Sequence, residues 1–219
     1  MEVHDAPKLS KYIEGIVKQR IERPAGIHVS DLTSCITRSY WNKKSESQAA
    51  DDATLMRWFI GVAVEEKLSL GKTQIPKLVD NIWASPDLEL PTMFVEIKTT
   101  RVSIVEDGLK YGWPLEWIRR MMTYCWIHEK LEWYLVVVGL IQAKMLVKKF
   151  SWTREELYDF WTQFILVRRN VLQQAVTESI PPEPFAWNES WECEGCQYKL
   201  ICTGVKQYGE YIKRGDETL

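Results

Sequence analysis

The feature that most constrains the fold of this chain is its set of cysteines. Cys193, Cys196 and Cys202 follow one another as C-x2-C-x5-C near the C-terminal end, while Cys35 and Cys125 lie far upstream. Spacings this short let one loop surround a metal centre with three sulfurs. A distant fourth cysteine would complete a four-thiolate site. We therefore expect a bound metal centre to hold the C-terminal part against an earlier part of the chain.

Composition narrows the class of protein. The chain has 219 residues, of which 46% are hydrophobic and 26% charged, so we expect one packed globular domain. It has no apolar run of about 18 residues that could span a bilayer and no apolar signal segment at its start, which predicts a cytoplasmic protein with no membrane partner. The net charge of −2 excludes an overall basic field, so a nucleic-acid partner would need a local basic patch.

Hydrophobic periodicity predicts helices alternating with short strands, which is the pattern of an α/β fold. In the expected helix 53–70, we expect the inward face to carry Leu55, Trp58, Phe59, Val62 and Leu68. The expected helices are 8–22, 31–41 with Cys35 in its middle, 53–70, 114–130 and 153–179, the expected strands are 73–79, 81–84, 88–90, 93–99, 133–141 and 143–150, and a loop-rich tail follows from 181.

Two carboxylates stand out among these strands. Asp87 follows Pro86, and Glu96 precedes Ile97 and Lys98. If Asp87 lies at the end of one strand and Glu96 on its neighbour, both carboxylates can reach one divalent cation, with the carbonyl of Ile97 as a third oxygen ligand. Period-two alternation places Lys98 on the face of Glu96, where an ammonium can orient an attacking water. The tripeptide by itself is weak, because Glu65-Glu66-Lys67 also fits E-x-K and most such matches are solvated surfaces.

Together these residues resemble a known family. Pro86-Asp87 with Glu96-x-Lys98 is similar to the PD-(D/E)xK nuclease core. Cys35 with the C-x2-C-x5-C tail resembles the iron-sulphur nucleases of the RecB/AddB type, among them the small exonucleases of the fourth CRISPR-associated (Cas) protein family. The resemblance runs from about His28 to Gly204. It implies a restriction-endonuclease-like α/β fold with a central mixed sheet flanked by helices. Within a single domain 1–219, it implies a nuclease core at 53–178 and a cysteine-ligated subdomain built from 27–45 and 181–204.

The resemblance also implies two metal centres. A [4Fe-4S] cluster would be ligated by Cys35, Cys193, Cys196 and Cys202, and a structural Zn2+ ion is the alternative because four thiolates suit either. Cys125 is then a buried apolar residue. A Mg2+ or Mn2+ ion would be held by Glu65, Asp87, Glu96 and the carbonyl of Ile97. Glu65 stands where the family motif G-x-x-x-H has His, and Glu66 is the ligand if the register differs by one residue.

A further departure lies on the expected helix 114–130. The family's Q-x-x-x-Y is here Arg120-x-x-x-Tyr124, whose members share a helical face. The resemblance implies a catalytic and DNA-contacting role for Tyr124, whereas the plain alternative makes Tyr124 and Trp117 core residues. Between residues 110 and 150 the chain has seven Lys or Arg against three Glu, which predicts a DNA groove. The predicted DNA-binding residues are Arg119, Arg120, Tyr124, Lys144 and Lys148.

The expected function is a Mg2+- or Mn2+-dependent deoxyribonuclease. By resemblance it is an exonuclease that prefers single-stranded DNA or frayed ends, in CRISPR adaptation or in viral or microbial DNA processing, with CRISPR adaptation or recombination proteins as partners. The alternative is a catalytically weak iron-sulphur adaptor subunit that binds DNA in a processing or integration complex. A third interpretation is a zinc-stabilised structural domain. The presence of Asp87, Glu96 and Lys98 together favours the enzyme.

Overall fold

The computed structural model describes residues 25–45, 52–70 and 76–216. The expected helix 8–22 and the first residues of the expected strand 73–79 lie outside these ranges. The main sheet has four strands in the order β4-β5-β8-β9. These are β4 (Leu88–Glu89), β5 (Phe94–Thr100), β8 (Glu132–Gly139) and β9 (Lys144–Ser151). Because β5 and β8 are parallel and the other pairs antiparallel, the expected mixed sheet is confirmed.

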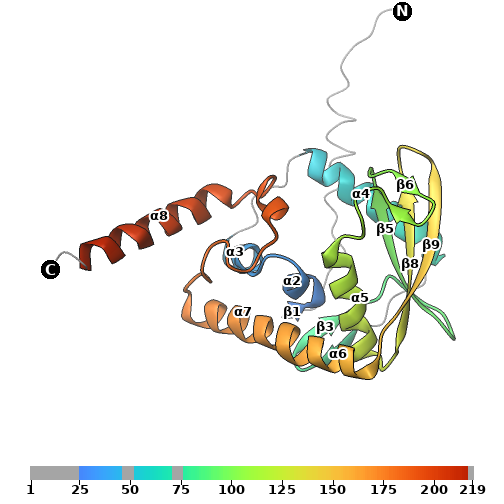
Figure 1. Cartoon of the computed structure of the whole chain (residues 1–219), viewed down its shortest axis with the longest axis horizontal. Helices are drawn as coiled ribbons and strands as arrows, with labels where there is room; N and C mark the ends of the chain where they lie inside the picture. The colour runs from blue at the N-terminus through green and yellow to red at the C-terminus, as the bar shows by residue number, and fades with distance from the viewer. Residues whose placement is uncertain (1–24, 46–51, 71–75, 217–219) are drawn as a thin grey trace, which may run out of the picture.

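The two faces of this sheet have different covers (Figure 1). The register places Glu96, Leu135 and Lys148 in one row across β5, β8 and β9, on the same face. Helix α5 (Leu115–Ile127), which connects the parallel strands β5 and β8, packs on that face. Helix α4 (Asp52–Ser69) packs against β5 on the opposite face, where a Cβ added to Gly61 would lie 3.9 Å from Oγ1 of Thr99.

Two smaller sheets accompany the main one. A three-stranded sheet joins β1 (Ile27–His28), β3 (Ile82–Ala84) and β2 (Lys77–Val79) in that order. Asp80 and Asn81 connect β2 to β3 with φ angles of 49° and 61°, the left-handed conformation that a two-residue hairpin turn needs. A further hairpin consists of β6 (Ile104–Val105) and β7 (Gly108–Leu109). The sequence analysis missed β1, β6 and β7, each of two residues.

The first cysteine lies between two helices. The sequence predicted one continuous helix at 31–41. The structure instead has two helices, α2 (Val29–Thr33) and α3 (Ile36–Lys44), so the predicted continuity through Cys35 is wrong. Cys35 is the N-cap of α3, and its Sγ accepts a hydrogen bond from the backbone N–H of Arg38 at 3.5 Å. An N-cap residue has non-helical backbone, here φ −57° and ψ 117°, so the helix is interrupted at Cys35.

The C-terminal third is mainly helical. The expected helix 153–179 is confirmed as α6 (Arg154–Phe160), a π-helical turn (Trp161–Ile165) and α7 (Leu166–Glu178), and it opens with a capping box between Thr153 and Glu156. The tail from residue 181 was expected to be loop-rich, and this is wrong from Lys199 onward, where a long helix begins. A 3-10 turn (Ser190–Cys193) is followed by α8 (Lys199–Asp216), which carries Cys202 and projects away from the body in Figure 1.

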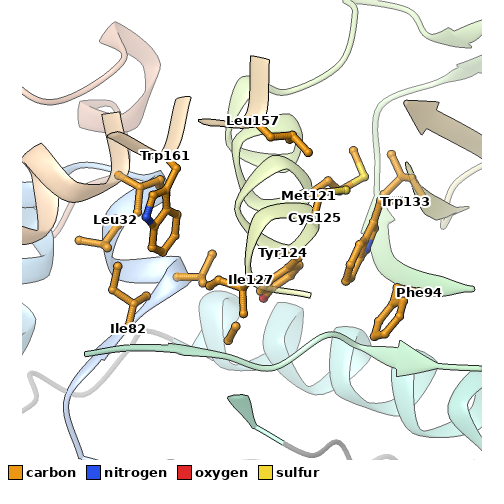
Figure 2. Packing of buried hydrophobic residues seen from close by; sticks show 14 of the residues in the cluster. Leu32, Ile82, Phe94, Met121, Tyr124, Cys125, Ile127, Trp133, Leu157 and Trp161 are labelled. Carbon is orange, nitrogen blue, oxygen red and sulfur yellow. The ribbon is translucent and has the colours of Figure 1, made fainter. Parts of the chain in front are cut away.

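The core lies where α5, the sheet and the long helix meet. Figure 2 shows Trp133 and Phe94 on one side of α5 and Trp161 and Leu32 on the other. The expected inward face of α4 is wrong in part, since Trp58, Phe59, Val62 and Leu68 are each more than a third exposed. The helix instead approaches the sheet at Gly61, which faces Thr99 of β5. No helix in the described ranges is long and apolar enough to cross a membrane.

Candidate active site

The predicted catalytic pair meets at the junction of β4 and β5. Leu88 pairs with Val95, so Asp87, one residue before β4, lies next to Glu96 on the neighbouring strand. Oδ2 of Asp87 accepts a hydrogen bond of 2.7 Å from the backbone N–H of Ile97. This bond fixes the Asp87 carboxylate against β5. The strand geometry therefore produces the two-carboxylate arrangement that the spacing predicted.

The ammonium of Lys98 lies at the centre of this arrangement. Its Nζ is 3.4 Å from Oδ2 of Asp87 and 3.0 Å from the carbonyl oxygen of Ile97, and it also contacts Oε1 of Glu96. The structure thus brings one oxygen from each of the three predicted ligands Asp87, Glu96 and Ile97 to a single cationic group. A site that gathers three oxygens around one cation has the donor set that a hard divalent ion prefers.

Glu96 is the most buried member of the site, with 0% exposure. Its Oε2 is buried and has no hydrogen-bond partner among the residues that the structure describes. Burial, and then the negative charge of Asp87, raise the pKa of Glu96, although Lys98 and Arg120 oppose this rise. Burial also works to lower the pKa of Lys98, but Asp87 and Glu96 outweigh it and raise that pKa. The carboxylate pair is therefore short of positive charge on the Oε2 side.

Arg120 also reaches this site. Its Nη1 lies 3.3 Å from Oε1 of Glu96 and its Nη2 lies 3.1 Å from Oε1 of Glu116, one helical turn earlier. Arg120 lies on the face of α5 that looks toward Glu96, as the ion pair between them shows. The predicted contact of Arg120 with a DNA phosphate stays a prediction, and both terminal nitrogens engage carboxylates in the structure.

The two alternatives for the third acidic ligand differ in exposure. Glu65 is half-buried and stands one turn after Gly61, on the helix face that meets β5, whereas Glu66 is exposed. Because α4 packs on the sheet face opposite to the one that carries Glu96, this difference does not decide between the two alternatives. The role of Glu65 as a metal ligand stays a prediction.

The predicted DNA-binding residues occupy different environments. Lys144 and Lys148 lie on the sheet face that carries Glu96, Lys144 exposed and Lys148 half-buried. Arg119 instead pairs with Glu189 at 2.8 Å and lies over the ring of Phe164, toward the cysteine-bearing tail. The structure therefore brings the two lysines, and not Arg119, to the face of the candidate site.

Tyr124 lies in the core. It is 4% exposed, and its ring centroid is 5.3 Å from that of Trp133 (Figure 2). Trp117, on the same helix, is half-buried and packs against the core. The position of Tyr124 favours the packing interpretation that the sequence left open, and its catalytic and DNA-contacting roles stay predictions.

Four of the five cysteines come together. Cys35, Cys193, Cys196 and Cys202 line one cavity, with Asn188 and Glu192 beside them. Burial and the neighbouring cysteines raise the pKa of Cys202 to about 11 and raise that of Cys193 as well. Within the described residues, no three or more His, Cys, Asp or Glu side chains are close enough together to hold a metal ion, either at this cavity or around Asp87 and Glu96. The thiols therefore surround a shared space rather than one point.

The fifth cysteine is elsewhere. Cys125 is fully buried on α5 among the core residues (Figure 2), and burial raises its pKa to about 12. This placement agrees with its interpretation as a buried apolar residue.

Two residues that the sequence analysis missed organise the cysteine region. Glu192 is buried, and its Oε1 accepts hydrogen bonds from the backbone N–H of Cys35 at 2.8 Å and from Arg38 at 3.4 Å. Arg168 of α7 donates to the carbonyl of Leu32 at 2.6 Å and also to the carbonyl of Ser34. Glu192 directly precedes Cys193 in the sequence, and this adjacency is the signal that could have revealed it. Arg168 carried no motif that could have revealed it.

Known proteins resemble this chain in fold but not detectably in sequence family. No protein-family model matches the sequence, and no curated protein does. The structure is similar to the crystal structure of SSO0001, with a TM-score of 0.54 and 17% identity over 89% of this chain and 93% of that chain. It is also similar to an alkaline exonuclease, LHK-Exo from Laribacter hongkongensis, with a TM-score of 0.44 and 12% identity over 71% of this chain and 89% of that one. The same protein in complex with dAMP gives a TM-score of 0.44 and 14% identity over the same shares. These likenesses concern the fold, a mixed α/β arrangement.

Proposed function

We propose that this protein is a Mg2+- or Mn2+-dependent deoxyribonuclease that hydrolyses phosphodiester bonds at Asp87, Glu96 and Lys98. The observation that carries the proposal is the convergence of three oxygens, from Asp87, Glu96 and Ile97, on the ammonium of Lys98. Isolated E-x-K matches on solvated surfaces do not bury their glutamate, whereas Glu96 is 0% exposed.

The residues fit a divalent cation. A buried carboxylate oxygen without a partner is costly, and Oε2 of Glu96 is such an atom within the described part of the chain. Asp87, Glu96 and the Ile97 carbonyl would hold the cation, with Glu65 as the further proposed ligand. Once bound, the cation would lower the pKa of a coordinated water and withdraw charge from the phosphodiester.

The chain's own groups perform the remaining work. The bond from Ile97 N–H keeps Asp87 oriented, so the carboxylate is pre-organised for binding. Lys98 would orient the attacking water and offset the charge that develops on phosphate oxygens. Lys144 and Lys148, on the same sheet face, would receive the DNA backbone as point charges. The preference for ends and for single strands, which we propose as well, has its support in the family resemblance.

The test is cleavage of end-labelled and circular DNA, single- and double-stranded, with Mn2+ or Mg2+ and with EDTA. We expect release from ends, none with EDTA, and loss of at least about a hundredfold in rate for Asp87→Asn, Glu96→Gln and Lys98→Met. Glu89→Gln is the matched control, because Glu89 is an exposed carboxylate on β4 only two residues from Asp87. Circular dichroism and DNA binding should be retained in all four variants.

Full activity in Asp87→Asn, or equal losses in the Glu89→Gln control, would contradict the proposed site. DNA binding without cleavage by the unaltered protein would instead favour the adaptor interpretation. The partners of such an adaptor would be proteins of CRISPR adaptation or recombination.

We further propose a [4Fe-4S] cluster in the cavity lined by Cys35, Cys193, Cys196 and Cys202. The support is the chemistry of the donor set, four thiols on one cavity, with hydrogen bonds to sulfur from Arg38 N–H at 3.5 Å and from Asn188 Nδ2 at 3.1 Å. Such bonds stabilise thiolate ligands. Binding would draw the thiols inward. A structural Zn2+ ion is the alternative that the same thiols suit.

A further inference from the structure

The guanidinium of Arg120 is held at both ends by carboxylates. It bridges Glu96 and Glu116, at 3.3 and 3.1 Å, and its side chain is only 18% exposed. Burial works to lower the pKa of Arg120, but the charge of Glu96, with smaller contributions from Tyr124 and Glu116, raises it above its ordinary value. Arginine therefore supplies a fixed positive charge beside the candidate metal ligand.

The two oxygens of Glu96 have different surroundings. Oε1 contacts two cationic groups, Nζ of Lys98 and Nη1 of Arg120. Oε2 is buried and contacts no hydrogen-bond donor among the described residues. One oxygen is thus already paired with cationic side chains of the protein, and the other is left without a donor from the described residues.

Nuclease sites with two metal ions need both sides of such a carboxylate. Two ions about 3.5 to 4 Å apart act as a clamp on the attacking and leaving oxygens. A guanidinium that occupies Oε1 both blocks one of these positions and repels a second divalent ion across a short, partly buried distance. Glu116 prevents the guanidinium from moving away, because it holds the opposite nitrogen.

We propose that Arg120 takes the place of a second metal ion, so that the site binds a single Mg2+ or Mn2+ ion per chain. This inference rests on the proposed nuclease function and specifies its metal requirement. Arg120 is then a group of the active site that supplies the second positive charge from the protein itself. A chain with a neutral residue at this position would lack that charge, and Lys98 would be the one cationic side chain left at Oε1 among the described residues.

The first test needs no variant at the site. The full-length protein with its cysteine centre loaded is titrated with Mn2+ in the absence of DNA, and bound ions are counted by equilibrium dialysis and by electron paramagnetic resonance. We expect one Mn2+ that is lost in Glu96→Gln, and no spin-coupled Mn2+ pair. Two coupled ions would overturn the inference and leave the nuclease proposal intact. If Glu96→Gln binds Mn2+ as the unaltered protein does, the ion is not held by Glu96. That result would overturn the metal site and with it both proposals.

The second test removes the charge. Arg120→Gln should bind a second Mn2+, show the coupled signal and bind the first ion about tenfold more tightly. Glu116→Gln is the matched control, because it breaks the outer ion pair but keeps the cation beside Glu96, and it should still bind one ion. A folded Arg120→Gln protein that binds one ion with unchanged affinity contradicts the inference. If this variant does not fold, Arg120→Met tests the same loss of charge. The number of Mn2+ ions bound by the unaltered protein also tests the inference without any variant.

Discussion

At the scale of the residue, His128 shows how burial sets a charge state. It ends α5, with its ring centroid 4.8 Å from that of Phe94 and 5.8 Å from that of Trp133. Its Nε2 is buried and has no hydrogen-bond partner in the described part of the chain. Burial, together with the charges of Lys77 and Lys130, lowers its pKa from 6.5 to about 4. The folded protein therefore holds His128 neutral.

This pKa predicts a loss of stability in mild acid. Below pH 6.5 the unfolded chain binds a proton that the folded chain does not, so the free energy of unfolding falls as the pH drops from 6.5 to about 4. Because the imidazole is partly exposed, we expect His128 to account for about 1 to 2 kcal/mol of the fall. Urea unfolding at several pH values should show a smaller fall in His128→Phe, which keeps an aromatic ring against Phe94 and Trp133. Equal slopes for the two proteins would refute the assignment.

At the scale of the element, Arg168 connects three segments that are distant in the sequence. From α7 it bonds to the carbonyls of Leu32 and Ser34 on the segment before α3, and to the carbonyl of Trp187 at 3.1 Å. Its guanidinium also lies over the rings of Phe164 and Trp187. Burial lowers its pKa to about 10, which keeps it charged at neutral pH.

We predict that Arg168→Met lowers the free energy of unfolding by about 3 kcal/mol. It leaves buried carbonyls without donors, and hydrogen bonds from charged donors are the stronger kind. Arg169→Met is the control, since Arg169 is the next residue of α7 and bonds near the surface to Asn170 and to the carbonyl of Asp80. It should change the stability by about 0.5 kcal/mol or less. Equal losses in the two variants, measured by urea unfolding, would show that Arg168 has no special role.

At the scale of the whole molecule, the cysteine cavity joins the two ends of the described chain. Cys35 comes from the segment between α2 and α3, Cys193 and Cys196 from the turn before α8, and Cys202 from α8 itself. Glu192 adds a direct hydrogen bond between these segments through the backbone N–H of Cys35. A metal centre here would restrict the unfolded chain and contribute its binding energy to folding.

We predict that Cys193→Ser, purified without oxygen, loses its iron and its brown colour and becomes sensitive to proteases within 181–204. The core around Trp133 should stay folded, because it lies on the sheet and α5. Cys125→Ser is the control, since Cys125 lies in the core, and it should keep the colour. A colourless unaltered protein that contains zinc would favour the zinc alternative, and retention of iron in Cys193→Ser would contradict the four-cysteine site.

Much of this architecture follows from local pattern in the sequence. Period-two alternation predicted β5 and the common face of Glu96 and Lys98, and helical periodicity predicted α5 and the long helix after Thr153. These are consequences of backbone geometry, which repeats every two residues in a strand and about every 3.6 in a helix. The pairing of Asp87 with Glu96 was also predictable, because adjacent short strands place neighbouring residues side by side.

Only the tertiary structure decided which of these side chains meet. Arg119 and Arg120 are adjacent, yet one pairs with Glu189 and the other with Glu96. Tyr124 belongs to the core, and Cys35 rather than Cys125 joins the tail cysteines. The sequence by itself determined the elements and the chemistry they carry, because propensity and spacing act over a few residues. Partners were decided by packing between distant segments, whose relative rotation no local pattern records.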